Sequence, residues 1–177
     1  MRVVAGELKG RRLASPRRRS EAVRPTADRV REALFAILGD VTDARVLDLY
    51  CGTGALAIEA LSRGASRATL VDVRTSLARR NVEGLGLAGR CEVVRSDAAR
   101  YLRRTRRRFD LVFCDPPYRL ADRLEGELDS LVADRLAEGG RLIAESAARR
   151  PLQLSLPLDV ERRFGDTLIR IHRAAPR

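Results

Sequence analysis

The tetrapeptide Asp115-Pro116-Pro117-Tyr118 carries residue types suited to chemistry on a flat ring that bears an amino group. It directly follows an apolar run at residues 109–114 that is typical of a buried strand. Two consecutive prolines lack N–H donors and hold the backbone extended, so the nearby carbonyl groups can accept hydrogen bonds from a ligand. Asp115 adds a carboxylate acceptor, and Tyr118 adds a ring for stacking. The same residue types are also ordinary in a turn that closes a strand.

A second candidate site lies in the segment from Asp48 to Gly54, between a predicted strand and a predicted helix. Gly52 and Gly54 allow the chain to turn sharply and let a ligand approach the backbone. Asp72 ends the next predicted strand, about 20 residues beyond the glycines, where a carboxylate can accept hydrogen bonds from a ribose diol. The segment is a shortened form of the dinucleotide-binding fingerprint, although Asp72 is also compatible with a plain turn.

Two features favour S-adenosylmethionine over a nicotinamide dinucleotide as the cofactor. Ala57 and Ile58 stand where the fingerprint has its third glycine. Asp48 would repel a pyrophosphate, whereas a carboxylate suits the sulfonium and ammonium groups of S-adenosylmethionine. Asp97 could accept a hydrogen bond from the adenine amino group, or it could cap the helix that starts at Ala98. The candidate cofactor-binding residues are Asp48, Tyr50, Gly52, Thr53, Gly54, Asp72, Asp97 and Ala98.

Methyl transfer to an exocyclic amine would use both candidate sites. The lone pair of an aromatic amine is delocalised into the ring, which makes the nitrogen a poor nucleophile. Asp115 and the Pro116 carbonyl could accept both amine hydrogens and so favour a pyramidal nitrogen, while Tyr118 stacks on the base for roughly 1–3 kcal/mol. The base must leave its helix or come from an unpaired loop. The candidate catalytic residues are Asp115, Pro116, Pro117 and Tyr118.

The charge balance favours a polyanionic partner and argues against a purely structural role. The formal net charge is +11 over 177 residues, and Lys9 is the only lysine. Guanidinium groups suit phosphates because they can donate two hydrogen bonds at once. One group of arginines lies at residues 100–108, with a solvated helix face as the alternative. The other group, which could share one phosphate-binding face with the first, comprises Arg2, Arg11, Arg12, Arg17, Arg18, Arg19, Arg24, Arg29 and Arg31.

The elements that must position these residues form an α/β pattern. Short apolar runs alternate with helical patterns from residue 45 onward, which is typical of βαβ units and a parallel sheet. Two further strands joined by Gly165-Asp166 predict a terminal hairpin, with Ile169 and Ile171 on one face and one antiparallel strand in the sheet. We expect strands at residues 45–50, 68–73, 91–95, 109–114, 141–145, 158–164 and 167–172, and helices at 55–63, 75–85, 98–104 and 121–137.

The segment before residue 41 has a different pattern. Residues 3–6 and 10–13 predict a small hairpin, followed by a basic loop and a helix with Thr26 as its N-cap. We therefore expect an N-terminal hairpin and helix extension at residues 1–40 and one compact catalytic domain at residues 41–177. The apolar stripe that should pack the helix onto this domain comprises Val30, Leu34, Ile37 and Leu38.

Cysteine and histidine usage argues against disulfides, metals and histidine catalysis. Cys51, Cys91 and Cys114 form no CxxC pair and suggest a reducing compartment, with each thiol buried in or beside a strand. His172, the only histidine, lies among arginines on the last predicted strand, so we expect it on the surface. No apolar run approaches the length of about 20 residues that spans a bilayer, and no apolar leader opens the chain. We expect a cytoplasmic protein without metal or membrane partner.

These motifs resemble the RsmD-type bacterial ribosomal RNA guanine-N2 methyltransferases. Arg2-Val3-Val4-Ala5-Gly6 with Lys9-Gly10-Arg11-Arg12-Leu13 looks like the opening hairpin of that family, and the helix after Arg24-Pro25-Thr26 looks like its hallmark helix. Residues 46–65 are similar to its cofactor loop, and residues 115–118 to its catalytic tetrapeptide. The Arg-Pro-Thr helix ahead of the loop is the specific part. Tyr50-Cys51 and Thr53 depart from the usual Phe-Ala and Ser.

The resemblance implies both a fold and a substrate. The fold is a Rossmann-like class I S-adenosylmethionine-dependent methyltransferase, with a mostly parallel seven-stranded sheet and a C-terminal antiparallel hairpin. The substrate is N2 of guanine 966 in 16S rRNA, presented as free RNA, as the 30S ribosomal subunit or as its assembly intermediate. We expect a monomer, because the reaction requires only one chain. The candidate RNA-binding residues are Arg11, Arg12, Arg17, Arg18, Arg19, Arg24 and Thr26.

Three other functions stay open from the residues alone. An adenine-N6 methyltransferase acting on DNA or RNA is the nearest, because the tetrapeptide suits any exocyclic aromatic amine. A non-catalytic RNA-binding protein would explain only the arginines. A nucleotide-dependent oxidoreductase fits the glycine loop but neither Tyr118 nor the charge.

Overall fold

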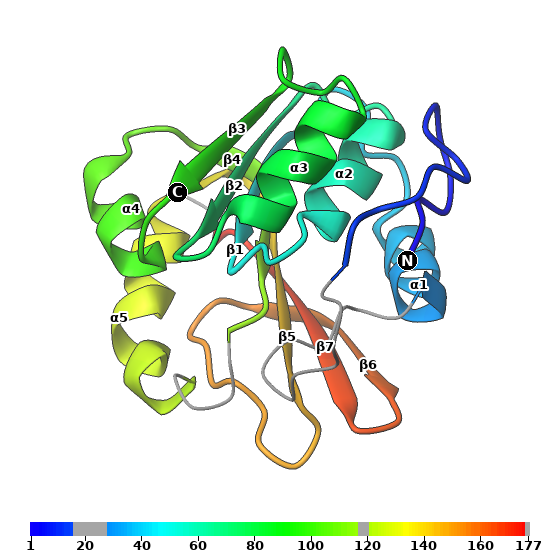
Figure 1. Ribbon diagram of the computed structural model, residues 1–177. Coiled ribbons are helices and arrows are strands. Elements are labelled where there is room, and N and C mark those ends of the chain that lie inside the picture. The colour runs from blue at the N-terminus through cyan, green and yellow to red at the C-terminus, as the bar shows by residue number, and fades with distance from the viewer. Residues whose placement is uncertain (16–27, 117–120, 176–177) are drawn as a thin grey trace.

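The computed structural model describes residues 1–15, 28–116 and 121–175, which form a seven-stranded sheet with helices on both faces (Figure 1). The strand order is β3-β2-β1-β4-β5-β7-β6. The first five strands of that order run parallel, and β7 is antiparallel to both β5 and β6. The elements are α1 (Asp28–Leu38), β1 (Arg45–Leu49), α2 (Ala55–Ser62), β2 (Arg67–Asp72), α3 (Ser76–Gly84), β3 (Cys91–Arg95), α4 (Ala98–Arg104), β4 (Phe109–Cys114), α5 (Ala121–Ala133), β5 (Leu136–Ala147), β6 (Leu158–Phe164) and β7 (Thr167–Arg173).

Both the predicted parallel sheet and the predicted C-terminal hairpin are confirmed, and the main difference lies around β5. The helix expected to run to residue 137 ends at Ala133, and the strand expected at residues 141–145 already begins at Leu136. The early start follows from pairing, because Phe109 is opposite Leu136 and a register shift follows before Leu111 pairs with Arg141. The glycine pair inside this strand hid its first part from a reading based on apolar runs.

Two apolar cores lie on opposite faces of the sheet. The core under α1, α2 and α3 contains Phe35, Ile58 and Val82, and Ile169 and Ile171 of β7 belong to it together, as predicted. The core under α4 and α5 contains Leu102 and Val132, packed on strand residues such as Leu49 and Val112. Successive side chains of a strand point to opposite faces, which explains how β1 contributes to both cores.

The N-terminal segment, residues 1–14, packs against the same face as α2. It forms a hairpin in which Val3 N donates to Arg11 O at 2.9 Å and Gly10 N donates to Val3 O at 2.9 Å. Val3 and Leu13 are buried in the first core. Gly6 has φ +80°, and a Cβ atom there would lie 1.7 Å from the Ser62 carbonyl oxygen. Only glycine can therefore make this contact without moving the segment away from α2.

The expectation of a surface position for His172 is wrong. His172 is 3% exposed, and its Nδ1 lies 2.8 Å from the Leu156 carbonyl oxygen. The reason is the place of β7 inside the sheet, between β5 and β6, with the chain around Leu156 covering the face to which His172 points. An edge position would have exposed it, and β6 takes that edge instead.

The cysteines are buried and free, as expected: Cys51, Cys91 and Cys114. Within the described ranges, no group of three or more histidine, cysteine or acidic side chains is arranged to hold a metal ion. None of the helices in the described part of the chain is long and apolar enough to cross a membrane.

Candidate active site

Four aspartates meet at the carboxyl edge of the parallel strands. Asp48 lies in β1, Asp72 ends β2, Asp97 follows β3 and Asp115 follows β4. Leu49 pairs with Cys114 on one side and with Val71 on the other, so the last residues of neighbouring strands lie side by side. This edge is where ligands of open α/β sheets bind. The sheet therefore brings together all four predicted carboxylates.

The loop at residues 50–54 is held in one conformation by left-handed residues and by Asp72. Tyr50, Gly52 and Gly54 have φ values of 60°, 53° and 77°. Asp72 Oδ2 accepts a hydrogen bond from Gly52 N at 2.9 Å, and its Oδ1 accepts one from Arg74 N at 2.8 Å. A Cβ atom on Gly54 would lie 2.5 Å from Leu70 Cδ2. The predicted glycine loop is thus present, and Asp72 supports it directly.

Thr53 is fixed by a residue that the sequence reading missed. Thr53 is 5% exposed, and its carbonyl oxygen accepts a hydrogen bond from Asn81 Nδ2 at 2.9 Å. Asn81, in α3, is itself 4% exposed. A single asparagine in an amphipathic helix gives no sequence signal for such a contact, because its partners lie far away in the chain.

Asp97 caps α4. Its Oδ1 accepts a hydrogen bond from Arg100 N at 3.1 Å, and Ala98 begins the helix as a buried residue. The capping alternative considered for Asp97 is therefore confirmed. A contact with an adenine amino group stays a prediction.

The Tyr50 hydroxyl can donate a hydrogen bond that no described residue accepts. Its hydroxyl oxygen is buried, and it has no hydrogen-bond partner among the described residues. Burial is the main cause that raises the pKa of Tyr50 above its ordinary value, with the nearby Cys114, Asp97 and Asp72 contributing. Because a buried hydroxyl without a partner is unfavourable, a ligand with an acceptor atom fits this position.

The acids at the end of β1 and β4 form an acidic cluster suited to a cation. Asp48 is 3% exposed, and its Oδ2 accepts a long hydrogen bond of 3.3 Å from Ala57 N. Burial, with a smaller contribution from Asp72, raises the pKa of Asp48 to about 7. Burial also raises the pKa of Asp115 well above its ordinary value, and Glu145 and Asp48 raise it further. A positively charged ligand would favour the ionised form of these acids, so the donor set fits a sulfonium or an ammonium group.

The structure describes only the first half of the tetrapeptide at residues 115–118. Asp115 is partly exposed and Pro116 is buried, directly after the last paired residue of β4. Pro117 and Tyr118 lie outside the described residues. The neighbouring Cys114 is a neutral thiol at ordinary pH, because burial raises its pKa to about 12, and it offers no nucleophile here.

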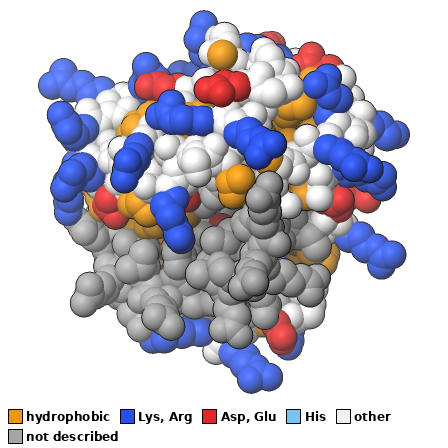
Figure 2. All heavy atoms as spheres, viewed as in Figure 1, with side chains coloured by type: hydrophobic (Ala, Val, Ile, Leu, Met, Phe, Trp, Pro, Cys, Tyr) orange, Lys and Arg blue, Asp and Glu red, His pale blue; other side chains and the backbone are white. Residues whose placement is uncertain are grey.

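The described arginines do not form the single phosphate-binding face that was considered. Arg31 is 0% exposed and pairs with Glu59, so it cannot bind RNA. The N-terminal segment and α4 cover opposite faces of the sheet (Figure 1), because Val3 belongs to one core and Leu102 to the other. Basic side chains are spread over the face shown in Figure 2, with acidic ones between them.

Arg11 and Arg12 are exposed, and Arg11 Nη2 donates to the Gly84 carbonyl at 3.3 Å. Their position next to α3 keeps them compatible with an RNA-binding role. The other candidate RNA-binding residues lie outside the described ranges: Arg17, Arg18, Arg19, Arg24 and Thr26.

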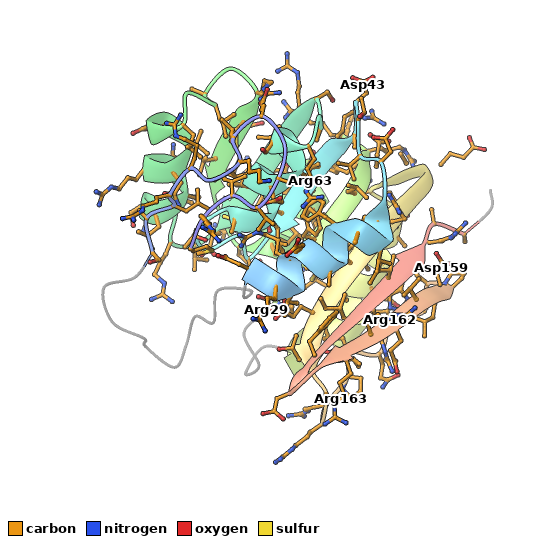
Figure 3. The ribbon with its side chains drawn as sticks, turned by 90° about the vertical axis from the view of Figure 1, so that its right-hand side faces the viewer. Arg29, Asp43, Arg63, Asp159, Arg162 and Arg163 are labelled. Atoms are coloured by element: carbon orange, nitrogen blue, oxygen red, sulfur yellow. The ribbon has the colours of Figure 1, made fainter. Side chains whose placement is uncertain are left out.

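A buried ion cluster joins the N-terminal segment and α1 to α2. Glu59 accepts hydrogen bonds from Val4 N at 2.8 Å and Ala5 N at 2.9 Å, and it forms ion pairs with Arg31 and Arg63. Figure 3 shows α1 in front of the sheet with the labelled Arg63 above it, and the Arg63 guanidinium lies 4.8 Å from the centre of the Phe35 ring. Glu59 is the only charged residue of α2, but its partners in this cluster lie outside that helix, and no local pattern indicates them.

The chain is similar to a known protein family and to proteins named as methyltransferases. The family model described as "Conserved hypothetical protein 95" matches residues 1–172. The "Ribosomal RNA small subunit methyltransferase D" of Escherichia coli strain K12 is 41% identical over 122 residues, which cover 67% of this chain and 61% of that protein. The alignment thus spans less than two thirds of that relative. The "Putative rRNA methyltransferase YlbH" of Bacillus subtilis is 37% identical over 157 residues, 82% of each chain.

Among solved structures, the "Putative methyltransferase yhhF" from Escherichia coli superposes with a TM-score of 0.84 at 33% identity. The superposition covers 100% of this chain and 99% of that one. The predicted fold, a Rossmann-like methyltransferase sheet with a C-terminal antiparallel hairpin, is thereby confirmed.

Proposed function

The chain belongs to the RsmD-type family of ribosomal RNA methyltransferases, and from this premise we propose that it methylates the exocyclic N2 of guanine 966 in 16S rRNA. The observation that carries the proposal is the acidic cluster of Asp48 and Asp115. Asp48 and Asp115 lie together beside a glycine loop, at the edge where the tetrapeptide begins. Although the chain has a net charge of +11, these acids lie where we expect a cationic ligand and an amine to meet.

S-adenosylmethionine supplies an activated methyl group to this site when bound. Asp72 would hold the ribose diol and Asp97, next to Ala98, the adenine amino group. Asp48 would face the cationic end, and the loop of Gly52, Thr53 and Gly54 would bring its backbone close to the ligand. The unpartnered Tyr50 hydroxyl supports this assignment, since it has a hydrogen bond to donate and lies near Asp72 and Asp97.

Asp115 and the Pro116 carbonyl would accept the two hydrogens of the target amine. This arrangement favours a pyramidal nitrogen whose lone pair points at the methyl group. Burial raises the pKa of Asp115, which makes its ionised carboxylate a stronger base, so it could also take the proton that the methylated amine must release. Tyr118 would stack on the base, and Pro117 would keep the backbone rigid. Much of the acceleration would come from positioning.

The RNA would be bound through the N-terminal segment. Arg11 and Arg12 are exposed on it, close to α3. The partner is 16S rRNA, the 30S subunit or its assembly intermediate, and we expect the protein to act as a monomer in the cytoplasm. The other proposed RNA-binding residues are Arg17, Arg18, Arg19, Arg24 and Thr26.

The nearest alternative is an adenine-N6 methyltransferase, because Asp115 and Pro116 would accept hydrogens from either amine. The preference for guanine rests on the N-terminal hairpin and helix of the family. A non-catalytic RNA-binding protein would gain nothing from this acidic cluster, because charges that are buried without a partner cost stability.

Target-nucleoside analysis tests the proposal. The protein is incubated with methyl-labelled S-adenosylmethionine and 30S particles that lack the modification, and the rRNA is digested to nucleosides. We expect the label in N2-methylguanosine, with no incorporation into 30S particles that are already modified. Label in an adenine nucleoside would support the alternative enzyme, and label in no base would contradict both.

A further inference from the structure

Asn81 uses all of its hydrogen-bonding groups to join two separate parts of the chain. Its Nδ2 donates to the Thr53 carbonyl at 2.9 Å and to the Ala14 carbonyl at 3.1 Å. Its Oδ1 accepts from Ala14 N at 2.7 Å. A primary amide has two donor hydrogens and one carbonyl acceptor, so each group of Asn81 has a partner. The side chain is 4% exposed, which makes these bonds costly to lose.

The two parts that Asn81 joins are those proposed to bind RNA and cofactor. Ala14 ends the docked N-terminal segment, three residues before Arg17 in sequence. Thr53 lies at the centre of the glycine loop, between Gly52 and Gly54. One side chain in α3 therefore fixes the end of the segment and the peptide carbonyl of the loop at once.

A second set of contacts ties the same segment to the helix that follows the loop. Ser62 Oγ accepts from Leu8 N at 2.9 Å, and the Ser62 carbonyl accepts from Glu7 N at 2.8 Å. Glu59 accepts from Val4 N and Ala5 N. The segment thus rests on α2 along residues 4–8, while its end at Ala14 reaches the loop through Asn81. In Figure 1 it runs along the side of α2, and the loop enters that same helix.

We infer that Asn81 is a positioning residue that couples RNA binding by the N-terminal segment to cofactor binding by the loop at residues 50–54. The inference rests on the proposed function. RNA that holds the segment in its docked position also holds the Asn81 amide, and the amide holds Thr53 in its place. By linkage, cofactor in the loop strengthens RNA binding by the same factor as RNA strengthens cofactor binding.

The test measures the affinity for S-adenosylhomocysteine by calorimetry, with and without saturating rRNA fragment that carries the target guanine. For the unaltered protein we expect RNA to tighten binding by about fivefold or more. Asn81→Ala should weaken binding without RNA and abolish the tightening. Ala14→Pro removes the N–H that donates to Asn81 Oδ1 and puts the proline ring in its place, so it releases the end of the segment from Asn81. It should keep the RNA-free affinity within about twofold and still reduce the tightening. Glu83→Ala, an exposed change in α3, is the control and should match the unaltered protein.

An RNA effect that is absent from the unaltered protein, or that survives in both Asn81→Ala and Ala14→Pro, would overturn the inference. If Asn81→Ala fails to fold, Ala14→Pro decides alone, because Ala14 is only partly buried and lies outside the helices and strands. A purely structural role for Asn81 would lower thermal stability and leave the RNA effect in place. Failure of the proposed function looks different, since no N2-methylguanosine would then form with any variant.

Discussion

The molecule buries two groups of carboxylates, and their surroundings differ. Glu59, in α2, is 0% exposed and receives two backbone N–H groups and two guanidinium groups. Asp48, in β1, is 3% exposed, accepts a long hydrogen bond from one backbone N–H and lies near other acids. The first carboxylate is neutralised by the fold itself. The second has a raised pKa, as does Asp115 beside it.

This difference separates a structural acid from a proposed ligand-binding acid better than burial does. A buried charge is unfavourable unless it is paired and hydrogen-bonded. Glu59 meets this condition with groups of the chain. Asp48 and Asp115 would meet it with groups of a ligand, so we expect a bound cation or amine to stabilise the charged form of this cluster. Substitution of Glu59 should therefore mainly change stability, whereas substitution of Asp115 should mainly change the rate of methyl transfer.

The largest expected effect is on stability, at the structural acid. Glu59→Gln keeps the shape of the side chain but leaves the buried Arg31 guanidinium with the partly exposed Asp28 as its only described acidic partner. We expect the free energy of unfolding to fall by about 3–5 kcal/mol, as measured by urea denaturation. Glu83→Gln, an exposed change in the next helix, should alter it by less than about 0.5 kcal/mol. A loss below about 1 kcal/mol for Glu59→Gln would show that Glu59 stabilises the fold no more than an exposed ion pair does.

The next effect is on catalysis, at the binding acids. Asp115→Asn removes a carboxylate acceptor and a base but leaves the shape of the site. We expect the rate of methyl transfer at saturating substrates to fall about 100-fold or more, which corresponds to about 2.7 kcal/mol of activation free energy. The melting temperature should not fall. Asp110→Asn is the matched control, because Asp110 lies at the other end of the same strand and pairs with the exposed Arg45. Equal rates for Asp115→Asn and the unaltered protein would exclude Asp115 from the reaction.

The smallest effect is a pH dependence of stability that Asp48 causes. Its pKa of about 7 in the folded chain lies above its ordinary value of 3.8, so between these values the folded state holds more protons than the unfolded state. The stability contributed by Asp48 is full below pH 4 and is lost as pH rises toward 7. Relative to Asp48→Asn, the ligand-free protein should lose up to about 1.4 kcal/mol per pH unit in this window. Urea denaturation at pH 5 and pH 7 checks this, and parallel pH profiles of the two proteins would contradict it.

Much of the fold could be predicted because each central strand is a short apolar run. The limits of β3, β4, α4 and β6 were predicted as they are observed. The start of β5 was missed because Gly139 and Gly140 interrupt its pattern. His172 was misplaced because polarity suggests a surface, whereas the position of β7 between two strands decides its burial.

The sequence predicted the residues of the candidate site, but not the residues that hold its loop and the N-terminal segment in place. Asp48, Asp72, Asp97 and Asp115 follow from the rule that parallel strands place their carboxyl ends at one edge. Asn81 and Glu59 could not be found in this way, because their partners Ala14 and Val4 lie 67 and 55 residues away. Local patterns carry no information on such pairs. Arg31 was counted with the phosphate-binding arginines for the same reason.

The docking of residues 4–14 also sets an order of events during synthesis on the ribosome. Val4 can bind Glu59, Leu8 can bind Ser62 and Ala14 can bind Asn81 only after the later residue of each pair has been made. The two residues of these pairs are 55, 54 and 67 positions apart in the sequence. The segment therefore cannot take its place until α2 and α3 have left the exit tunnel, although it is made first. Until then, the apolar side chains of Val3 and Leu13 cannot pack into the first core. The hairpin that is made first can therefore join the molecule only after α2 and α3.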